Sequence, residues 1–257
     1  MQLQFHRINP DASIAIFTWD DNSDSHASII APVFMEYGMR CTFYINPGVP
    51  SFSSRLAPMY RELSDEGFEI GSHGDVHQHL SSLSGTEYVQ QLKKSQSTIE
   101  QYLKKRPTTF AFPHHDFDIS MLSQARNVYF ETRNSLFHSK RFSLKTATLL
   151  EEIEETLDEV LQHKENMLVF SGHGAFEGAF EFDRFGYEPV SASKIRAILN
   201  MICNRHGVQV CTLEQAALRS YLLLHGTQCG NIVEIDSIQA DLLCQYGLTY
   251  ERMLQIL

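Results

Sequence analysis

Short apolar runs alternate with segments of helical spacing along most of the chain, and this alternation constrains the fold more than any other feature. Strands that pair in parallel need a crossover segment between them, and that segment is usually a helix. About seven such repeats predict a parallel sheet, either open and doubly wound or closed into a barrel. We expect strands at Ser13–Thr18, Cys41–Ile45, Phe68–Gly71, Thr109–Phe112, Val128–Glu131, Met167–Ser171 and Val208–Thr212.

Three amphipathic stretches predict crossover helices. Residues 84–103 carry apolar side chains at helical spacing behind a capping box of Ser84 and Glu87, and this helix must end near Pro107. A second helix is expected over residues 149–161, behind a capping box at 148 and 151. A third is expected over residues 195–202.

Composition excludes several classes of protein. The chain has 257 residues, 43% hydrophobic and 20% charged, which is typical of a globular protein of this length. Its net charge of −10 argues against a nucleic-acid partner, because an acidic protein repels phosphate backbones. We find no stretch of roughly 20 apolar residues that could span a membrane and no signal-peptide pattern. Five cysteines without CxxC spacing predict reduced thiols, so we expect a cytoplasmic protein.

The composition changes after Leu224. The segment 225–230 carries two glycines, and a short strand at Asn231–Asp236 and short helices at Ser237–Gln245 and Thr249–Leu257 are expected to follow. A tail of this size is too short to fold alone. We therefore expect residues 1–224 to form the α/β domain and residues 225–257 to form an appendage. The appendage would pack on that domain or on a neighbouring subunit, so a homo-oligomer is compatible with the sequence.

Polar side chains follow several expected strands at their carboxyl ends, where active sites of parallel α/β proteins collect. Asp20 and Asp21 follow the first strand, and His73 and His77 follow the third. Adjacent carboxylates need a cation or a shared proton, although a helix N-cap is the alternative. Histidines four residues apart share one face of a helical turn and can grip one metal. One carboxylate and two imidazoles suit a catalytic metal, and His79 faces away from them.

Two further strands also end in chemically active residues. His173 follows an apolar strand and is flanked by Gly172 and Gly174, which leaves room for a substrate beside it. Histidine is suited to general acid catalysis, and the alternative is a turn whose glycines serve the backbone. The segment FAFPHHDFD forms a dense polar loop, which is expected to contact substrate, support the metal or face solvent.

The motifs FTWDD, SHGDVH, FAFP and LVFSGHG, in this order within residues 13–217, resemble those of the NodB-type polysaccharide deacetylases. Those proteins are metal-dependent carbohydrate esterases of family four. The resemblance implies a distorted (β/α) barrel of about seven units and one divalent metal. Zinc is the expected ion, with cobalt, nickel and iron as alternatives. By position, the resemblance implies a general base at Asp20, a general acid at His173 and metal ligands at Asp21, His73 and His77.

The sequence departs from the family pattern in the turns and in one loop. Asn22 stands where glycine is frequent, and asparagine also tolerates left-handed backbone angles. Gly74 stands where serine or threonine is frequent. The family loop continues from proline to Tyr-Gly, whereas Pro113 is followed here by His114 and His115. The resemblance implies that this loop contacts the substrate and that the His114 main-chain N–H serves the oxyanion.

A second departure concerns the arginine that orients the catalytic base in the family. Ala111 occupies that position in this chain. The loss of this arginine would alter the tuning of Asp20, unless Arg133 or Arg141 substitutes for it from another loop.

The sequence predicts a metal-dependent N-deacetylase that acts on an amino sugar or a glycan intermediate and releases acetate. Two alternatives stay open at this point. The same chemistry serves hydrolysis of a small non-sugar amide or deformylation of a lipid-linked sugar. The altered Pro-His-His loop would also suit a carbohydrate-binding homologue without turnover.

Overall fold

An eight-stranded parallel sheet forms the centre of the protein. The computed structural model describes residues 1–135, 139–162, 167–179 and 187–257. The strands run in the order β6-β5-β4-β3-β2-β8-β7, and β11 also pairs with β2. Their bounds are β2 Ser13–Trp19, β3 Thr42–Ile45, β4 Glu69–Ser72, β5 Thr109–Phe110, β6 Glu131–Thr132, β7 Ser139–Ser143, β8 Met167–Gly172 and β11 Val208–Cys211.

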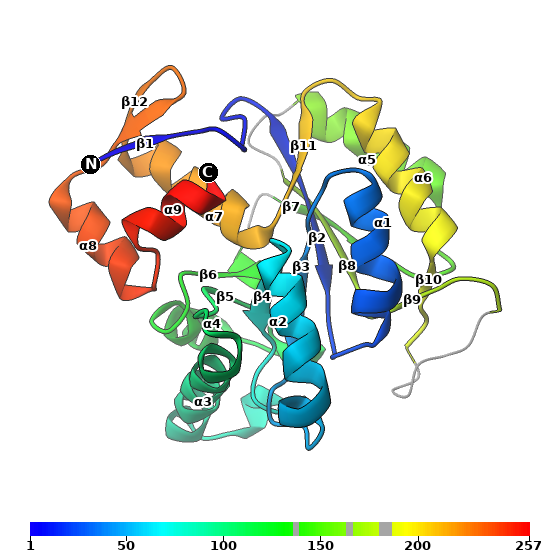
Figure 1. Ribbon diagram of the computed structural model, residues 1–257, viewed down its shortest axis with the longest axis horizontal. Helices are drawn as coiled ribbons and strands as arrows, with labels where there is room; N and C mark the ends of the chain where they lie inside the picture. Colours follow the sequence, from blue (N-terminus) through cyan, green and yellow to red (C-terminus); the bar gives the residue numbers. More distant parts are fainter. Residues whose placement is uncertain (136–138, 163–166, 180–186) are drawn as a thin grey trace.

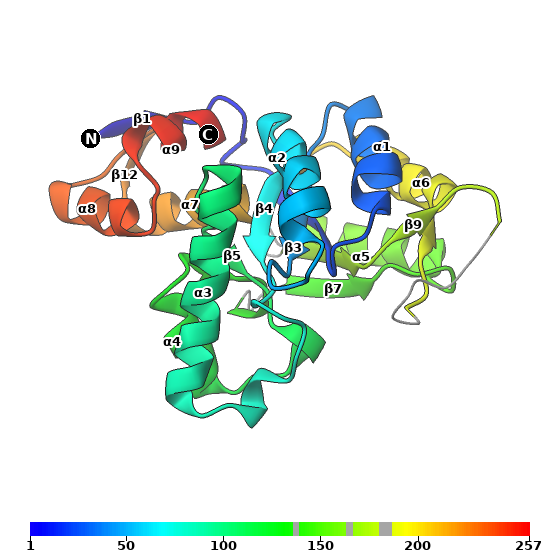
Figure 2. The same ribbon diagram turned by 60° about the horizontal axis from the view of Figure 1, so that its bottom comes forward.

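Helices cover the outside of this curled sheet (Figures 1 and 2). Between β2 and β7 they are η1 His26–Ile30, α1 Ala31–Glu36, η2 Phe52–Leu56, α2 Ala57–Asp65, η3 Leu80–Ser82, α3 Gly85–Leu103, η4 Pro113–His115, α4 Ile119–Arg126 and η5 Arg133–Ser135. After β7 come α5 Leu150–Gln162, α6 Ala192–Cys203 and α7 Leu213–His225, with a short parallel pair of β9 Ala175–Phe176 and β10 Val190–Ser191. The distorted (β/α) barrel expected from the sequence is confirmed.

Most expected elements form within a residue or two of their predicted bounds. The capping box of Ser84 and Glu87 opens α3. The expected box at Thr148 does not open α5, because the Thr148 hydroxyl instead donates to the Ser143 carbonyl and accepts the Lys145 N–H.

Two strands differ from expectation. The strand expected at Val128–Glu131 is wrong in position, since Val128 N–H bonds back to Ala125 at the end of α4 and β6 begins at Glu131. We did not expect β7, whose sequence SKRFS lacks an apolar run.

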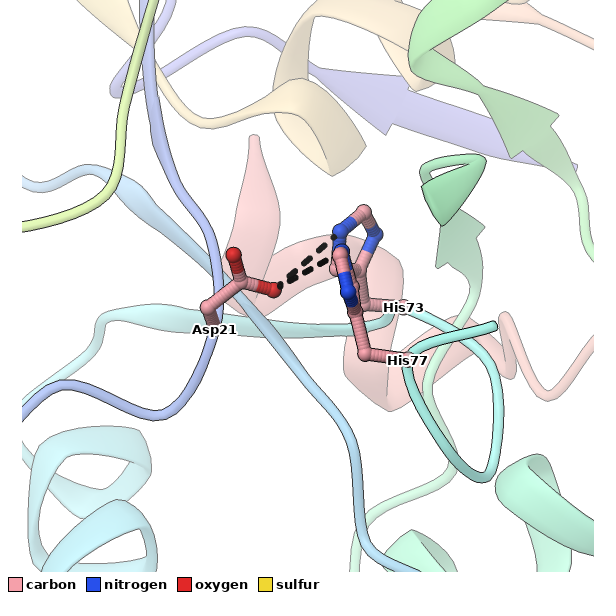
Figure 3. Close-up of side chains that lie close together, drawn as sticks. All are labelled: Asp21, His73 and His77. Atoms are coloured by element: carbon pink, nitrogen blue, oxygen red, sulfur yellow. Dashed lines mark ion pairs between the residues drawn. The ribbon is translucent and has the colours of Figure 1, made fainter. Parts of the chain in front are cut away.

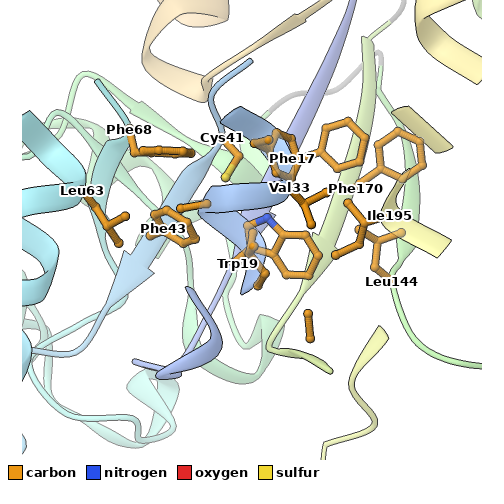
Figure 4. Packing of buried hydrophobic residues seen from close by; sticks show 14 of the residues in the cluster. Phe17, Trp19, Val33, Cys41, Phe43, Leu63, Phe68, Leu144, Phe170 and Ile195 are labelled. Atoms are coloured by element: carbon orange, nitrogen blue, oxygen red, sulfur yellow. The ribbon is translucent and has the colours of Figure 1, made fainter. Parts of the chain in front are cut away.

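Aromatic rings fill the space between the sheet and the helices that cover it (Figure 4). Phe17 of β2 stacks on Phe170 of β8 at 4.4 Å between ring centroids. Trp19, the last residue of β2, is fully buried. A Cβ atom on Gly172 would lie 2.7 Å from the Trp19 ring, so only glycine fits at the end of β8. This packing fixes the two strand ends that carry Asp20 and His173.

Both ends of the chain meet in a second small sheet (Figure 1). Strand β1 Gln2–Gln4 pairs with β13 Ile232–Glu234, which pairs with β12 Thr227–Cys229, all antiparallel. The helices α8 Ser237–Gln245 and α9 Tyr250–Ile256 follow. Their buried side chains join those of α7, β1 and β2 in one apolar cluster. The tail therefore packs on its own barrel, while a domain boundary after Leu224 stays a prediction because α7 runs through it.

Two expectations drawn from composition can be compared with the structure. In the described parts of the chain, no helix has both the length and the apolar character that crossing a bilayer requires. All five cysteines are free; Cys41 and Cys211 are buried, and the other three are exposed.

Candidate metal centre

The carboxyl ends of β2, β4, β5 and β8 lie at one rim of the sheet and carry the polar residues singled out in the sequence. Asp20 and Asp21 leave β2, and His73 leaves β4. The loop Pro113–His115 follows β5, and His173 leaves β8. Because β2 lies between β3 and β8 in the sheet, residues far apart in sequence become neighbours.

Asp21, His73 and His77 bring three metal-ligand atoms together (Figure 3). Asp21 Oδ1 lies 3.5 Å from His73 Nε2 and 3.4 Å from His77 Nε2. The three ligand atoms all lie within 4.8 Å of one another. Ligands at about 2.0–2.1 Å from a tetrahedral ion would stand about 3.4 Å apart. The spacing and the donor types therefore fit one divalent ion.

The imidazoles are held in the form that binds metal. His73 Nδ1–H donates to the Ala111 carbonyl at 2.8 Å, which leaves Nε2 to face Asp21. Burial lowers the pKa of His73 to about 4. Burial, assisted by the neighbouring His114, also lowers the pKa of His77 to about 4. Both rings are therefore neutral near pH 7, as metal coordination requires.

The segment that joins the two histidines is a loop and not the helical turn expected from their spacing. The structure assigns bends to residues 75–78, and Gly74 has a φ of 79°. This left-handed conformation suits glycine and explains why a larger residue is absent there. Lys94 Nζ donates to Asp75 Oδ2 at 2.6 Å, and Gly48 N–H donates to the Asp75 carbonyl at 2.6 Å. These bonds hold the loop in place of helical geometry.

Asn46 ties the two ligand-bearing turns together. Asp21 and Asn22 both have left-handed backbones, with φ of 74° and 54°. Asn22 Nδ2 donates to the Asn46 carbonyl at 2.8 Å, and Asn46 N–H donates to Asn22 Oδ1 at 3.1 Å. Asn46 Nδ2 also donates to the His73 carbonyl. The sequence analysis missed Asn46, although its place directly after β3 put it on the same rim.

Arg133 pairs with Asp20 through two parallel hydrogen bonds. Arg133 Nη1 and Nη2 lie 2.8 Å from the two Asp20 carboxylate oxygens, and Nη1 also donates to Thr18 Oγ1 at 2.9 Å. Burial alone would raise the pKa of Asp20, but the charge and hydrogen bonds of Arg133, together with His73 and His173, hold that pKa well below its usual range. Arg141 instead donates to main-chain carbonyls of Arg133 and Asn134. Of the two expected arginines, Arg133 is the one that faces Asp20.

His173 completes the rim on the side of β8. Its Nε2 lies 3.7 Å from Asp21 Oδ2, and its side chain is 29% exposed. The Tyr187 ring stacks on it at 3.9 Å with an interplanar angle of 9°. The sequence analysis missed Tyr187, because no local pattern links it to His173.

The sequence suggested that the glycines on either side of His173 leave room for a substrate. The structure shows a different role for them. Gly172 packs against Trp19, and a Cβ on Gly174 would lie 3.1 Å from the hydroxyls of Ser23 and Ser25. Both glycines make room for side chains of the protein itself.

The Pro113–His115 loop places imidazoles above the ligand site. The His114 ring lies 4.1 Å from the His77 ring and 4.1 Å from the His79 ring, on which it stacks. His115 is held at its Nδ1 by the Asn134 side-chain amide at 2.9 Å. Both His114 and His115 have a φ of 55°. Contact of this loop with substrate and oxyanion stays a prediction, and His79 lies at the surface as expected.

Residues 7–132 match the family model described as polysaccharide deacetylase. This part of the chain is similar in sequence to the polysaccharide deacetylases. The matched part contains Asp20, Asp21, His73 and His77, and it ends before His173.

Known proteins similar to this chain include one curated relative and several solved structures. The uncharacterized protein YlxY of Bacillus subtilis (strain 168) is 26% identical over 113 residues, 42% of this chain. The chain spans about a third (34%) of the length of that relative. The peptidoglycan deacetylase PdaC from Bacillus subtilis has a TM-score of 0.54 at 17% identity, covering 83% of this chain and 94% of PdaC.

A third similar protein shows what the fold alone leaves open. BA3943 from Bacillus anthracis, described as a CE4 family pseudoenzyme, has a TM-score of 0.55 at 14% identity, covering 81% of this chain and 66% of BA3943. At such identities the likeness concerns the fold. Whether a deacetylase homologue turns over substrate therefore depends on the groups at the rim.

Proposed function

We propose that this protein is a metal-dependent N-deacetylase that hydrolyses the N-acyl amide of an amino sugar or glycan intermediate and releases acetate. The observation that carries the proposal is the convergence of Asp21, His73 and His77. Asp20 and His173 flank this triad, and Nε2 of His173 lies 3.7 Å from Asp21. The family match supports a carbohydrate amide as the substrate.

Asp21, His73 and His77 would hold one divalent ion, with zinc as the first choice and cobalt, nickel or iron as alternatives. When bound, such an ion supplies Lewis-acid chemistry that polarises the amide carbonyl and makes water acidic. The proposal includes the cytoplasmic location expected from the sequence.

The chain's own residues divide the proton transfers between them. Asp20, kept anionic by Arg133, accepts a proton from the attacking water. His173 gives a proton from Nε2 to the leaving nitrogen, so that water and amide become acetate and a free amine. The main-chain N–H of His114 donates to the oxyanion that forms on the carbonyl oxygen. Pro113 and His115 border the same space.

Metal binding is tested by elemental analysis of the purified protein, combined with an assay for acetate release. We expect close to one equivalent of zinc in the purified protein, lost in His77→Ala. His79→Ala is the matched control, because His79 is an exposed histidine two positions away whose side chain bonds Asp116. Equal metal content in both variants would contradict the proposed ligand set.

The proton transfers are tested in protein with its metal bound. We expect Asp20→Asn and His173→Ala each to lower turnover by about 10²–10⁴-fold without loss of metal. Unchanged turnover in both variants would remove this mechanism.

The substrate class is tested by a panel, because the histidine loop departs from the family pattern. N-acetylated oligosaccharides, small ureide-type amides and a formylated amino sugar are compared at equal concentration. Release of acetate from the oligosaccharides supports the proposal. If another class of amide reacts faster, that class takes the place of the oligosaccharides as the proposed substrate. Binding of oligosaccharide without acetate under any of the four metals would indicate a pseudoenzyme, as BA3943 is described.

A further inference from the structure

The turn that carries His173 is docked on the segment that directly follows the Asp20–Asp21 pair. Ala175 N–H donates to Ser25 Oγ at 3.0 Å, and Ser25 Oγ lies 2.7 Å from Ser23 Oγ. On the other side, Val190 N–H donates to the Gly174 carbonyl at 3.1 Å. The turn is therefore held from two directions by main-chain and hydroxyl groups.

His26 contacts the main chain of His173 itself. His26 Nε2 lies 2.8 Å from the main-chain oxygen of His173, and His26 Nδ1 lies 2.9 Å from Tyr60 Oη. His26 and Tyr60 are fully buried, and the His26 ring stacks on Phe43 at 4.7 Å. Moving a buried side chain whose two nitrogens are both hydrogen-bonded is costly, because no water is at hand to replace the hydrogen bonds that are lost.

The partners of His26 settle its tautomer. A carbonyl oxygen can only accept, so His26 Nε2 carries the proton and donates to His173. Nδ1 is then an acceptor, and the Tyr60 hydroxyl donates to it. Tyr60 lies on α2, so this relay joins α2 to the strand end of β8 through the first turn of η1.

The segment from Asp21 to His26 thus links the proposed metal site to the turn that carries the proposed general acid, His173. Asp21 and His26 are five positions apart (21 to 26), and the intervening Ser23 and Ser25 also contact the His173 turn. η1 is a π-helix, a form that occurs mostly as single turns and frequently at functional sites. Movement of η1 would change the distance between the Asp21 carboxylate and the His173 imidazole.

We propose that His26 is a positioning residue for the deacetylation, which sets the place of His173 relative to the Asp21–His73–His77 site through its bond to the His173 main chain. Tyr60 acts behind it by fixing the His26 tautomer. This inference rests on the proposed function, because it assigns His26 to the proton transfer from His173 and not to metal binding.

The role predicts a split between two kinds of substrate. An amide nitrogen leaves only with a proton, which His173 supplies, whereas 4-nitrophenolate leaves an acetyl ester without one. Displacement of His173 should therefore slow amide hydrolysis and spare ester hydrolysis. A merely structural defect would lower both rates together through loss of folded protein.

The experiment compares kcat on an oligomer of N-acetylglucosamine with kcat on 4-nitrophenyl acetate, in zinc-loaded protein. We expect His26→Leu to lower amide turnover by about 10- to 100-fold with less than a threefold change on the ester. His26→Gln keeps a donor at the end of the side chain, and we expect it to recover most of the amide rate. Zinc content should stay at the wild-type level in both.

Tyr60→Phe tests the second link and needs no change at His26. We expect a fall in amide turnover of a few-fold with the ester rate unchanged. Tyr88→Phe is the matched control, because Tyr88 is also a buried tyrosine that donates to a carbonyl, that of Met121 at 2.8 Å, in a different apolar cluster. It should leave the amide-to-ester ratio at the wild-type value.

The outcomes separate this inference from the proposed function. Wild-type protein that releases no acetate from any amide overturns the proposed function and this inference with it. A second outcome overturns the role of His26 alone. In it the wild-type protein turns over the amide, and the amide-to-ester ratio changes in His173→Ala but stays at the wild-type value in His26→Leu. If His26→Leu does not fold, an unchanged ratio in Tyr60→Phe overturns it instead.

Discussion

The Asp20 carboxylate and the Arg133 guanidinium are held together inside the protein. Asp20 is 5% exposed and Arg133 is 8% exposed. Removing an ion from water costs several kcal/mol, which a bidentate partner in good geometry offsets. Either group alone would be a buried, uncompensated charge. The pair therefore keeps Asp20 anionic and aimed at the rim.

Breaking this pair should cost stability, and removing both members should recover it. We expect Arg133→Met to lower the free energy of unfolding by about 3–5 kcal/mol, because Asp20 is left buried without its partner. The double variant Asp20→Asn with Arg133→Met should recover most of that loss. Denaturant unfolding of the four proteins gives the coupling. Additive effects of the two substitutions would show that the carboxylate does not depend on Arg133.

His26 makes folding stability depend on pH. Burial lowers the pKa of His26 from 6.5 to about 4 in the folded protein. The unfolded chain then binds the proton first, so stability is complete above about pH 6.5 and falls as pH drops toward 4. One unit corresponds to about 1.4 kcal/mol, which gives a loss of about 3 kcal/mol over this window.

His26→Gln isolates this contribution, because the other histidines are common to both proteins and cancel in the comparison. The difference in unfolding free energy between His26→Gln and wild type should move by about 3 kcal/mol in favour of the variant from pH 7 to pH 4. Urea unfolding at a series of pH values measures it. A difference that stays constant with pH would mean that His26 is not buried as a neutral ring.

Residue chemistry in sequence singled out the three candidate ligands that the structure brings together, but not the groups that support them. Asp21, His73 and His77 stand out because carboxylates and spaced histidines at strand ends have few other uses together. Arg133 could only be expected as one of two arginines, since its partner is 113 positions away in sequence. Asn46 and His26 act through main-chain carbonyls, and such partners depend on tertiary packing that spacing does not encode.

At the scale of elements, a buried ion pair fastens the last helix to the barrel. Arg252 of α9 donates to Glu214 at the start of α7, and Thr108 Oγ1 donates to the same carboxylate oxygen at 2.6 Å. The Glu214 side chain is 4% exposed and that of Arg252 is 13% exposed. Glu214 N–H also donates to Glu69 Oε2 at 2.8 Å, which extends the network into β4.

The contribution of an arginine to the free energy of unfolding should depend on how deeply its carboxylate partner is buried. We expect Arg252→Leu to lower the free energy of unfolding by about 3–5 kcal/mol, because Glu214 is left buried without its charge partner. Arg205→Leu is the contrast, since its partners Glu154 and Asp158 are 56% and 62% exposed. That change should cost less than about 1 kcal/mol. Similar losses in the two variants would contradict this account of the tail.

Elements with apolar patterns could be predicted from sequence, and those without could not. β2 and β8 are continuous apolar runs because both faces of a parallel sheet are covered. β7 lies at the end of the sheet, is polar except for Phe142, has exposed or half-exposed side chains, and carries no such signal. The run at Val128 is apolar because it packs below α4 in a separate cluster, so its pattern predicted a strand where the chain forms a turn.

At the scale of the whole molecule, the candidate metal site ties together parts of the sheet that fold from distant sequence. Asp21 leaves β2 while His73 and His77 follow β4, and β3 lies between these two strands. An ion that binds the folded protein and not the unfolded chain stabilises it by mass action. The sheet brings the three candidate ligands together, so binding of an ion there would be linked to folding of the barrel.

Zinc should therefore raise the stability of the entire barrel. At a free zinc concentration of about 100 times Kd, the free energy of unfolding should increase by about 2.7 kcal/mol, and a chelator should reverse the gain. His77→Ala should fold but respond little to zinc, while His79→Ala should respond as the wild type does. Calorimetry with and without the metal measures all three proteins. If zinc raised the unfolding temperature of His77→Ala as much as that of the wild type, the ion would bind elsewhere. The metal-dependent stability of the barrel would then not come from the strand ends of β2 and β4.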